Sequence, residues 1–324
     1  VEAVLAGDKP TRRGAISAPL YDTPRAVSTG PNWAYLRIAE GCDNRCAYCV
    51  IPSLRGKFRS RTKESILEEA RLLAASGVKE LIIVAQDITR YGIDLYGKVC
   101  LTELLKELCK LDFRWVRLHY LYPELIDDEL IDEIASEDKI VKYLDIPIQH
   151  INDTILRRMN RRGTGEEIRA LFKKLRERIP GLVLRTSLIT GLPGEGEAEF
   201  EELCDFLREA KIERAGVFPY SPEEGTPAAL MPDRCSTEEA QRRAELCMEI
   251  QAEIMDGFAE TFIGRELDVL VMGREPDGTP WGRSEYDSPD IDSRVIFSGD
   301  AAPGDMVRVR IDSVDDGELI GEQI

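Results

Sequence analysis

Short apolar runs alternate with longer amphipathic stretches over the first two thirds of the chain. The apolar runs are rich in Val, Ile, Leu and aromatic residues, and they predict strands at 35–39, 80–85, 115–119, 143–148, 183–189 and 215–218. The stretches between them carry apolar residues at helical spacing and predict helices at 63–76, 101–111, 124–136, 166–178 and 197–210. This alternation is typical of a parallel α/β sheet, either flat or curled into a partial barrel.

The pattern changes near residue 237. A long amphipathic helix is expected from residue 237 to about residue 258, because Ser236 and the acidic residues that follow it form an N-terminal cap signal. After it, short alternating runs at 267–271, 294–297 and 306–311 are separated by Gly, Pro and Asp turns, which predicts a small all-β barrel. We therefore expect a linker at 1–33, an α/β core at 34–258 and a β-barrel at 259–324.

The chain is acidic, with a formal net charge of -17. That charge disfavours nucleic acid as a partner, because phosphate backbones are bound by clustered Lys and Arg. Residues 260–324 carry 16 acidic and 6 basic side chains, so we expect the small barrel to help bind a basic protein. No apolar stretch approaches membrane-spanning length, and 8 cysteines in 324 residues are too few for a disulfide scaffold. We expect a cytoplasmic protein with reduced thiols and no membrane partner.

Three cysteines lie in one short loop after the first predicted strand. Cys42, Cys46 and Cys49 form a Cys-x-x-x-Cys-x-x-Cys pattern, and three thiolates can bind three irons of a cubane cluster while the fourth iron stays open to a substrate. The alternative is a closed zinc site, which takes four ligands, but His119 and His150 are far away in sequence. The other cysteines lack ligand spacing and are expected to be buried: Cys100, Cys109, Cys204, Cys235 and Cys247.

Polar residues and glycines follow several predicted strands, at the end of a parallel barrel where active sites gather. In chain order they are Gln86, Asp87, Gln149, His150, Gly191 and Glu195. The glycine-rich bend after residue 190 lets the backbone approach a ligand closely, although a plain strand-to-helix turn would also need glycine. A lone histidine is more often a satisfied hydrogen bonder than a catalyst, and we expect His150 to line the pocket. Two basic groups, at 55–63 and 157–162, are either solvated surface or neighbours of the site.

The cysteine spacing, with Tyr48 at the aromatic position before the last cysteine, resembles the radical S-adenosylmethionine (SAM) superfamily. Within that superfamily, the stretches 35–42, 51–61, 85–92 and 147–150 resemble the methylthiotransferases. They are more similar to the members that modify a ribosomal protein than to those that modify tRNA. The resemblance covers about residues 32–258, and the terminal barrel resembles a TRAM domain.

The resemblance implies a partial (βα)6 radical SAM barrel followed by a TRAM-like β-barrel. It implies that Cys42, Cys46 and Cys49 are catalytic and bind a 4Fe-4S cluster, whose open iron chelates the amino and carboxylate groups of SAM. Many members of the superfamily carry Gly-Gly-Glu where this chain has Ala85-Gln86-Asp87. Contacts to SAM are expected from the loop aromatic residue and from the strand ends: Tyr48, Gln86, Asp87, Gln149, His150, Gly191 and Glu195.

By the same resemblance, the reaction adds a methylthio group to the β-carbon of an aspartate in small-subunit ribosomal protein twelve. An external donor supplies electrons, one SAM is cleaved to a radical, and a second SAM supplies the methyl group. In the family, an amino-terminal domain with three further cysteines holds a second 4Fe-4S cluster that provides sulfur, and no such trio lies in residues 1–41. We therefore expect this chain to bind one cluster and cleave SAM without completing sulfur insertion.

Three alternatives stay open at this point. The first is a tRNA adenosine methylthiotransferase, which a basic TRAM surface would favour and the acidic composition does not. The second is another radical SAM reaction on the same core, distinguished by its product. The third is a ribosome-associated binding module without turnover, which the intact cysteine motif disfavours.

Overall fold

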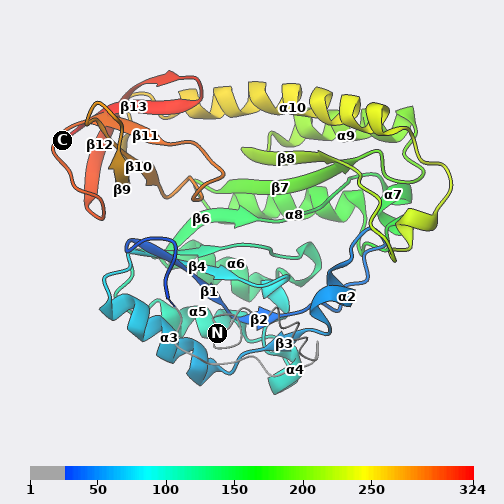
Figure 1. Ribbon diagram of the computed structural model, residues 1–324, viewed down its shortest axis with the longest axis horizontal. Coiled ribbons are helices and arrows are strands. Elements are labelled where there is room, and N and C mark those ends of the chain that lie inside the picture. Colours follow the sequence, from blue (N-terminus) through cyan, green and yellow to red (C-terminus); the bar gives the residue numbers. More distant parts are fainter. Residues whose placement is uncertain (1–25) are drawn as a thin grey trace, which may run out of the picture.

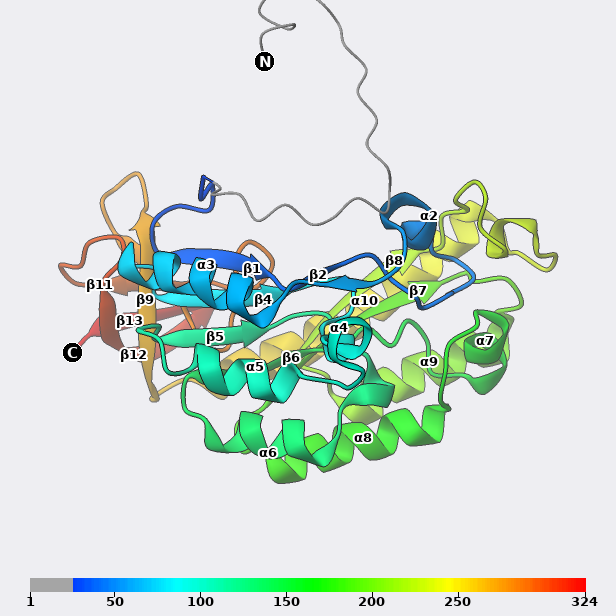
Figure 2. The ribbon, with the colours of Figure 1, turned by 90° about the horizontal axis from the view of Figure 1, so that it is seen from below.

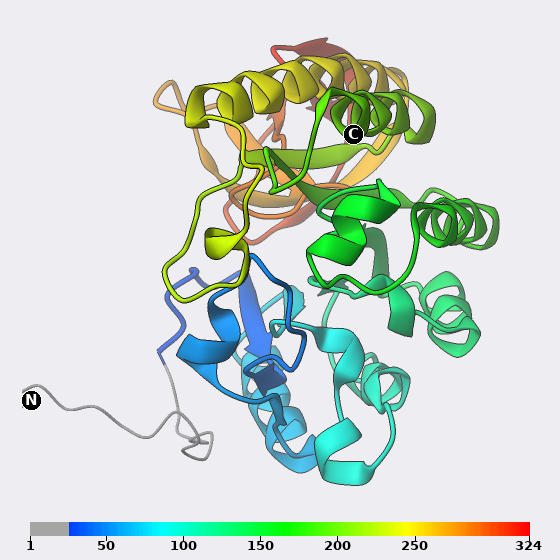
Figure 3. The same ribbon diagram turned by 90° about the vertical axis from the view of Figure 1, so that its right-hand side faces the viewer.

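The computed structural model describes residues 26–324, and the predicted linker before residue 26 lies outside the described part. Six strands form one parallel sheet in the order β1-β4-β5-β6-β7-β8. Their bounds are Trp33–Arg37, Glu80–Val84, Trp115–Leu118, Ile140–Asp145, Val183–Thr190 and Arg214–Pro219. The sheet is curled, with helices along its outer side (Figure 3), and β1 and β8 form its two edges. The predicted partial barrel is therefore confirmed.

The outer helices bury apolar stripes against the sheet and begin at capping side chains. Thr62 and Asp127 each accept a backbone N–H at a helix start, and Thr164 forms a capping box with Glu167. These helices are α3 (Lys63–Ala75), α5 (Leu101–Leu108), α6 (Asp128–Ser136), α8 (Gly165–Arg178) and α9 (Glu197–Ala210). In the described part of the chain, none of the helices has both the length and the apolar character needed to cross a bilayer.

Short helices occupy the loops. The hydrophobic pattern did not predict them, because each is too short to show a helical repeat of apolar residues. They are α2 (Ile51–Arg55), α4 (Ile93–Tyr96), α7 (Asp153–Arg158) and the 3-10 segments η1 (Ile88–Arg90), η2 (Pro123–Leu125) and η3 (Ala228–Leu230). A two-stranded pair, β2 (Ala39–Glu40) with β3 (Arg59–Ser60), brackets the cysteine loop.

Two predicted elements are misplaced by a few residues. The strand predicted at 143–148 is β6, which ends at Asp145; the residues after it stay buried without continuing the strand, since Pro147 has no N–H to donate. The helix predicted from residue 124 begins at Asp128, because Pro123 opens a 3-10 turn and Asp127 caps the helix itself. In both cases buried apolar residues in a loop extended the hydrophobic pattern beyond the element.

A long helix connects the core to the terminal barrel. Helix α10 (Thr237–Glu260) packs along β8, β7 and α9 (Figure 1), and Ser236 caps it as expected. The following strands close a barrel in the order β10-β11-β13-β12-β9. The pattern missed β10 and β13, which contain Pro, Gly and charged residues. Their bounds are β9 Glu266–Arg274, β10 Pro280–Ser284, β11 Val295–Ser298, β12 Met306–Asp315 and β13 Glu318–Gln323.

The terminal barrel sits at the end of the sheet where the strands begin, opposite α2 (Figure 2). The loop after β10 enters the curled sheet, where Asp287 pairs with Arg214 of β8 at 2.8 Å and Asp292 accepts a hydrogen bond from Tyr143 of β6 at 2.7 Å. Arg283 of β10 also pairs with the sheet, since its guanidinium lies 2.5 Å from the Glu80 carboxylate of β4. We call this set the interdomain charge network; its members are Glu80, Arg117, His119, Tyr143, Arg214, Arg283, Asp287, Ser288 and Asp292.

Candidate functional site

The three cysteines of the motif lie between β2 and α2, at the carboxyl end of the sheet. Cys46 is buried, whereas Cys42 and Cys49 are partly exposed. The chain turns into the loop at Gly41, where φ is +84° and a Cβ would lie 2.2 Å from a backbone oxygen, so only glycine fits. Two backbone bonds hold the loop, from Cys42 to Gly56 at 3.1 Å and from Ala47 to Met159 at 2.8 Å.

Gln86 and Asp87 hold the same loop from the end of β4. The Gln86 side chain accepts a hydrogen bond from the Gly41 amide at 2.6 Å, and Asp87 accepts one from Asn44 at 2.9 Å. The second carboxylate oxygen of Asp87 accepts from Thr89, and the side chain is fully buried. Burial raises the pKa of Asp87. The observed contacts of both residues are to the cysteine loop, and their contact to SAM stays a prediction.

Cys46 has two polar neighbours that come from other loops. Tyr122 places its hydroxyl 2.9 Å from the Cys46 sulfur, and Arg161 places Nη1 3.9 Å from it. The guanidinium of Arg161 stacks on the Tyr122 ring at 4.2 Å and donates to the Pro147 carbonyl at 2.8 Å. Sequence reasoning placed Arg161 only in a basic group and missed Tyr122, although Tyr122 follows β5 and inspection of every strand end would have included it.

Tyr48 lies in a small apolar cluster beside the loop, formed by residues from α7, from the bend after β7 and from the segment that leads to α10. Burial raises the pKa of its phenol. The Ala47 carbonyl accepts a backbone bond from Ala228 at 2.9 Å, so the segment before α10 lies against the cysteine loop (Figure 3). The predicted role of Tyr48 as a SAM contact is compatible with this position and stays a prediction.

The structure brings four predicted residues together at the ends of β6 and β7. His150 lies 3.3 Å from a Glu195 oxygen, without the alignment of a hydrogen bond. The other Glu195 oxygen accepts from the Gly191 amide at 2.8 Å and from Arg243 of α10 at 3.0 Å. Gln149, at a φ of +72°, exchanges backbone bonds with β7. These residues form a buried support, and their contact to SAM stays a prediction.

The glycine of this bend has an identifiable packing role. Gly191 has a φ of +75°, and a Cβ there would lie 2.4 Å from Ala240 of α10. The absent side chain therefore makes room for α10, a packing role that the sequence did not predict, and the positive φ is what a plain strand-to-helix turn would also need. His150 is only half satisfied as a hydrogen bonder: its Nδ1 accepts from the Asn152 amide at 3.0 Å, whereas its Nε2 has no hydrogen-bond partner among the described residues. That bond leaves the proton of a neutral imidazole on Nε2, facing Glu195.

The donor set fits an iron-sulfur cluster better than zinc. Burial raises the pKa of Cys42 to about 11 and also raises that of Cys49, so bound metal must displace the thiol protons. A closed zinc site takes four ligands, whereas a cluster takes each thiolate on a different iron and can leave one iron without a protein ligand, so three thiols in one loop suit a cluster.

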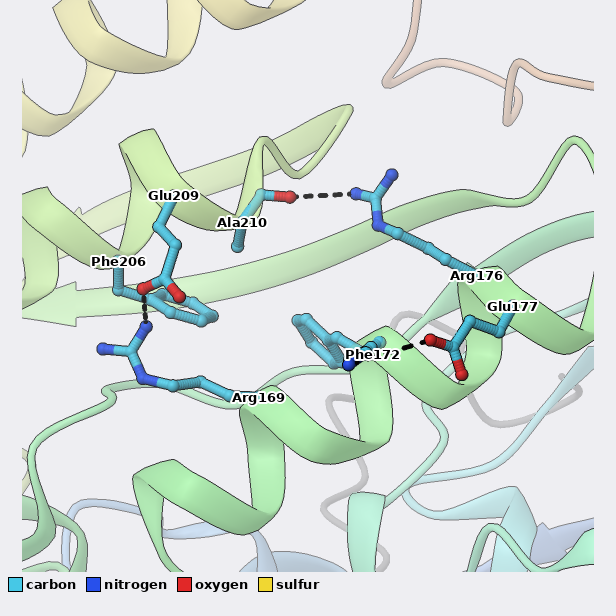
Figure 4. A pocket seen from close by; sticks show the side chains of 8 residues that line it. Arg169, Phe172, Arg176, Glu177, Phe206, Glu209 and Ala210 are labelled. Carbon is cyan, nitrogen blue, oxygen red and sulfur yellow. Dashed lines mark hydrogen bonds and ion pairs between the residues drawn. The ribbon is translucent and has the colours of Figure 1, made fainter.

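Neither of two hollows among the described residues is lined by Cys42, Cys46 or Cys49. One, of about 610 Å³, lies beside the bend after β7 and is lined by Gly191, Tyr220 and the first turn of α10. The other, of about 360 Å³, lies between α8 and α9 on the outer layer (Figure 4). Its basic side chains pair with acidic ones, as Arg169 does with Glu209, and its floor is apolar. The second hollow is remote from every predicted site residue.

Comparison with known proteins agrees with the family resemblance seen in the sequence, both in the core and in the terminal barrel. Residues 36–207 match the Radical SAM superfamily model, and residues 263–324 match the TRAM domain model. A Ribosomal protein uS12 methylthiotransferase RimO from Caldanaerobacter subterraneus subsp. tengcongensis is 49% identical over 302 residues, which are 92% of this chain and 69% of the relative. The RimO of Pelotomaculum thermopropionicum is 50% identical over 331 residues, covering 100% of this chain and 74% of the relative. The chain belongs to the radical SAM methylthiotransferase family.

Solved structures support the fold of this family member. The radical SAM methyltransferase TsrM from Kitasatospora setae, with cobalamin and a [4Fe-4S] cluster bound, superposes with a TM-score of 0.51 at 20% identity, over 60% of this chain and 38% of TsrM. Coproporphyrinogen III oxidase (HemN) from Escherichia coli gives 0.52 at 20% identity, over 70% of this chain and 54% of HemN. At such identities the likeness concerns the barrel alone.

Proposed function

We propose that this methylthiotransferase acts on ribosomal protein uS12, with Cys42, Cys46 and Cys49 as the ligands of a 4Fe-4S cluster that binds SAM. The observation that carries the proposal is the three-cysteine loop at the carboxyl end of a parallel barrel, in a chain half identical to uS12 methylthiotransferases. The alternative of a binding module without turnover does not account for three cysteines in this position.

A bound cluster supplies the electron for reductive cleavage of SAM. The chain's own contribution is positioning: the three thiols hold the cluster, while Gln86 and Asp87 fix the loop that carries them. The loop packs against β4 and the segment before α10, and of its three thiols Cys46 is the buried one. Tyr48, Gln149, His150, Gly191 and Glu195 are proposed to face SAM or to support the residues that do.

The substrate side of the proposal rests on charge. Five of the six arginines in the terminal barrel are ion-paired, and Arg265 lies over aromatic rings. Exposed carboxylates such as Asp277, Asp315 and Asp316 add negative charge to its surface. We propose that this surface helps bind a basic segment of uS12 in the cytoplasm, and that an external donor reduces the cluster.

The deciding experiment is anaerobic reconstitution with iron and sulfide, followed by dithionite and SAM. We expect about four irons per chain and 5′-deoxyadenosine in the unaltered protein, and neither in the Cys42→Ala/Cys46→Ala/Cys49→Ala variant. Cys109→Ala, which removes a buried thiol from α5's end, is the matched control and should keep both. Iron and 5′-deoxyadenosine retained by the triple variant would refute the site.

A second step tests the substrate. The reconstituted protein is incubated with SAM, dithionite and either a uS12 peptide or tRNA, and 5′-deoxyadenosine is measured, because this chain is expected to cleave SAM without completing sulfur insertion. An increase in 5′-deoxyadenosine that depends on the peptide supports the proposal. An increase with tRNA alone would assign the chain to the tRNA branch of the family.

A further inference from the structure

Within residues 26–324, Arg161 is a buried cation without a carboxylate partner. The residue is 7% exposed, and in the part of the chain that the structure describes its polar contacts are the Pro147 carbonyl and the Cys46 sulfur. Its Nε has no partner, and Glu124 acts on it only from beyond ion-pair distance. Because a buried charge is costly unless it is paired, this position calls for an anion that the described residues do not supply.

Three other buried arginines, from the curled sheet and the terminal barrel, are different. Arg117 and Arg283 both pair with Glu80, at 2.6 and 2.5 Å, and Arg214 pairs with Asp287 at 2.8 Å. Among these four arginines, only Arg161 has no carboxylate within ion-pair distance among the described residues, and its guanidinium lies beside the Cys46 thiol. The side chain is also fixed in place, since it stacks on the Tyr122 ring at 4.2 Å and donates to a backbone oxygen. The guanidinium is therefore prepositioned beside Cys46 rather than free to reach solvent.

We propose that Arg161 and Tyr122 are positioning residues for the cluster: they hold Cys46 as a ligand and raise the reduction potential of the bound cluster. The inference rests on the proposed function, because it requires Cys46 to ligate a cluster. A nearby cation stabilises the more negatively charged reduced state. A hydrogen bond from the Tyr122 hydroxyl to the ligand sulfur acts in the same direction.

The test measures the midpoint potential of the reconstituted cluster. The measurement is a redox titration without SAM, in which electron paramagnetic resonance detects the reduced cluster. Arg161→Gln removes the charge, Arg161→Lys keeps it, and Tyr122→Phe removes only the hydroxyl. We expect Arg161→Gln to lower the ratio of reduced to oxidised cluster at a fixed poise by about tenfold, which is about 59 mV for one electron. Tyr122→Phe should lower it less, and Arg161→Lys should restore most of the loss.

Tyr143→Phe is the matched control, because it removes a buried hydroxyl whose partner is Asp292, at the opposite end of the sheet. It should leave the potential unchanged. If Arg161→Gln fails to assemble a cluster, Tyr122→Phe and Arg161→Lys still decide. A full iron content with unaltered potentials in Tyr122→Phe and Arg161→Gln would overturn the proposal.

SAM is the competing anion, because its carboxylate could pair with Arg161. In that case Arg161→Gln would weaken SAM binding and leave the potential of the SAM-free cluster unchanged, which also overturns the proposal. Failure of the unaltered protein to bind iron would instead remove the proposed function, and the inference with it. Measuring iron content, potential and SAM affinity on the same samples separates these results.

Discussion

The two ends of the curled sheet bury polar groups in opposite ways. At the end where strands begin, the interdomain charge network joins arginines to carboxylates from the terminal barrel, as in Arg214 with Asp287. At the carboxyl end, the cysteine loop buries thiols beside Arg161, which has no carboxylate in an ion pair among the described residues. In the first arrangement each of these arginines has a carboxylate partner within the chain. The second leaves charge and metal-binding capacity open to a ligand, and that difference distinguishes a structural network from a functional site.

The largest expected effect is on the structural side. Glu80 is fully buried between Arg117 and Arg283; burial alone would raise its pKa, but the two guanidinium groups hold that pKa below its ordinary value. Glu80→Gln leaves both cations without their carboxylate, and we expect the free energy of unfolding to fall by about 3–5 kcal/mol. Urea denaturation measures it.

Glu103→Gln is the matched control for Glu80→Gln, because Glu103 pairs with Lys63 and Lys98 near the surface, where ion pairs contribute little. We expect its unfolding transition to stay close to that of the unaltered chain. Reconstituted Glu80→Gln that is still folded should bind as much iron as the unaltered protein. A stability loss no larger than that of the control would show that the network is not a main support of the interface.

The next effect appears as pH falls. Burial, helped by Arg117, lowers the pKa of His119 to about 3, against about 6.5 in an unfolded chain. Between these two pKa values, His119 is protonated in the unfolded state and neutral in the folded state. The stability contributed by neutral His119 is complete above about pH 6.5 and is lost progressively toward pH 3.

The measurement is the free energy of unfolding at pH 7 and pH 5 for the unaltered chain and for His119→Gln. We expect the unaltered chain to lose about 2 kcal/mol more between these pH values than the variant loses. Equal losses in the two proteins would mean that His119 is protonated in the fold and that its contact with Ser288, at 3.0 Å, does not require a neutral ring.

The sequence predicted the parts of the molecule that depend on local patterns. The six strands and the outer helices follow from hydrophobic periodicity, and the cysteine loop follows from spacing alone. The curling of the sheet came from the family resemblance, because periodicity does not encode how neighbouring strands are rotated. Likewise, the pairing of Asp287 with Arg214 joins residues far apart in sequence, and neither residue carries a local signal of its partner.

The site shows the same division. The residue positions after the strands were found, but the directions of their side chains were not. Gln86 and Asp87 turn toward the cysteine loop, and Gly191 makes room for Ala240 of α10. Tyr122 was not predicted as a site residue, because a tyrosine before a proline is common in ordinary turns and carries no signal of a binding role. Tertiary packing decides which of several strand-end residues face a ligand and which support the residues that do.

The smallest expected effect concerns this support. Gln86→Ala removes the acceptor of the Gly41 amide, a bond of 2.6 Å at the entrance of the cysteine loop. The net value of such a bond is about 1 kcal/mol, which corresponds to roughly a fivefold change in the population of the correctly folded loop. We expect slower cluster assembly and a several-fold lower yield of 5′-deoxyadenosine, with global unfolding little changed, as followed by iron uptake and urea denaturation.

Gln251→Ala is the matched control. Gln251 is a buried glutamine of α10 that donates to the Ile212 carbonyl, just before β8 begins. It should reduce the free energy of unfolding without slowing iron uptake, which is the reverse of the result expected for Gln86→Ala. If both variants lose stability and iron uptake together, the cysteine loop and the barrel unfold as one unit. The two ends of the sheet would then differ in the chemistry of their buried groups but would not unfold independently.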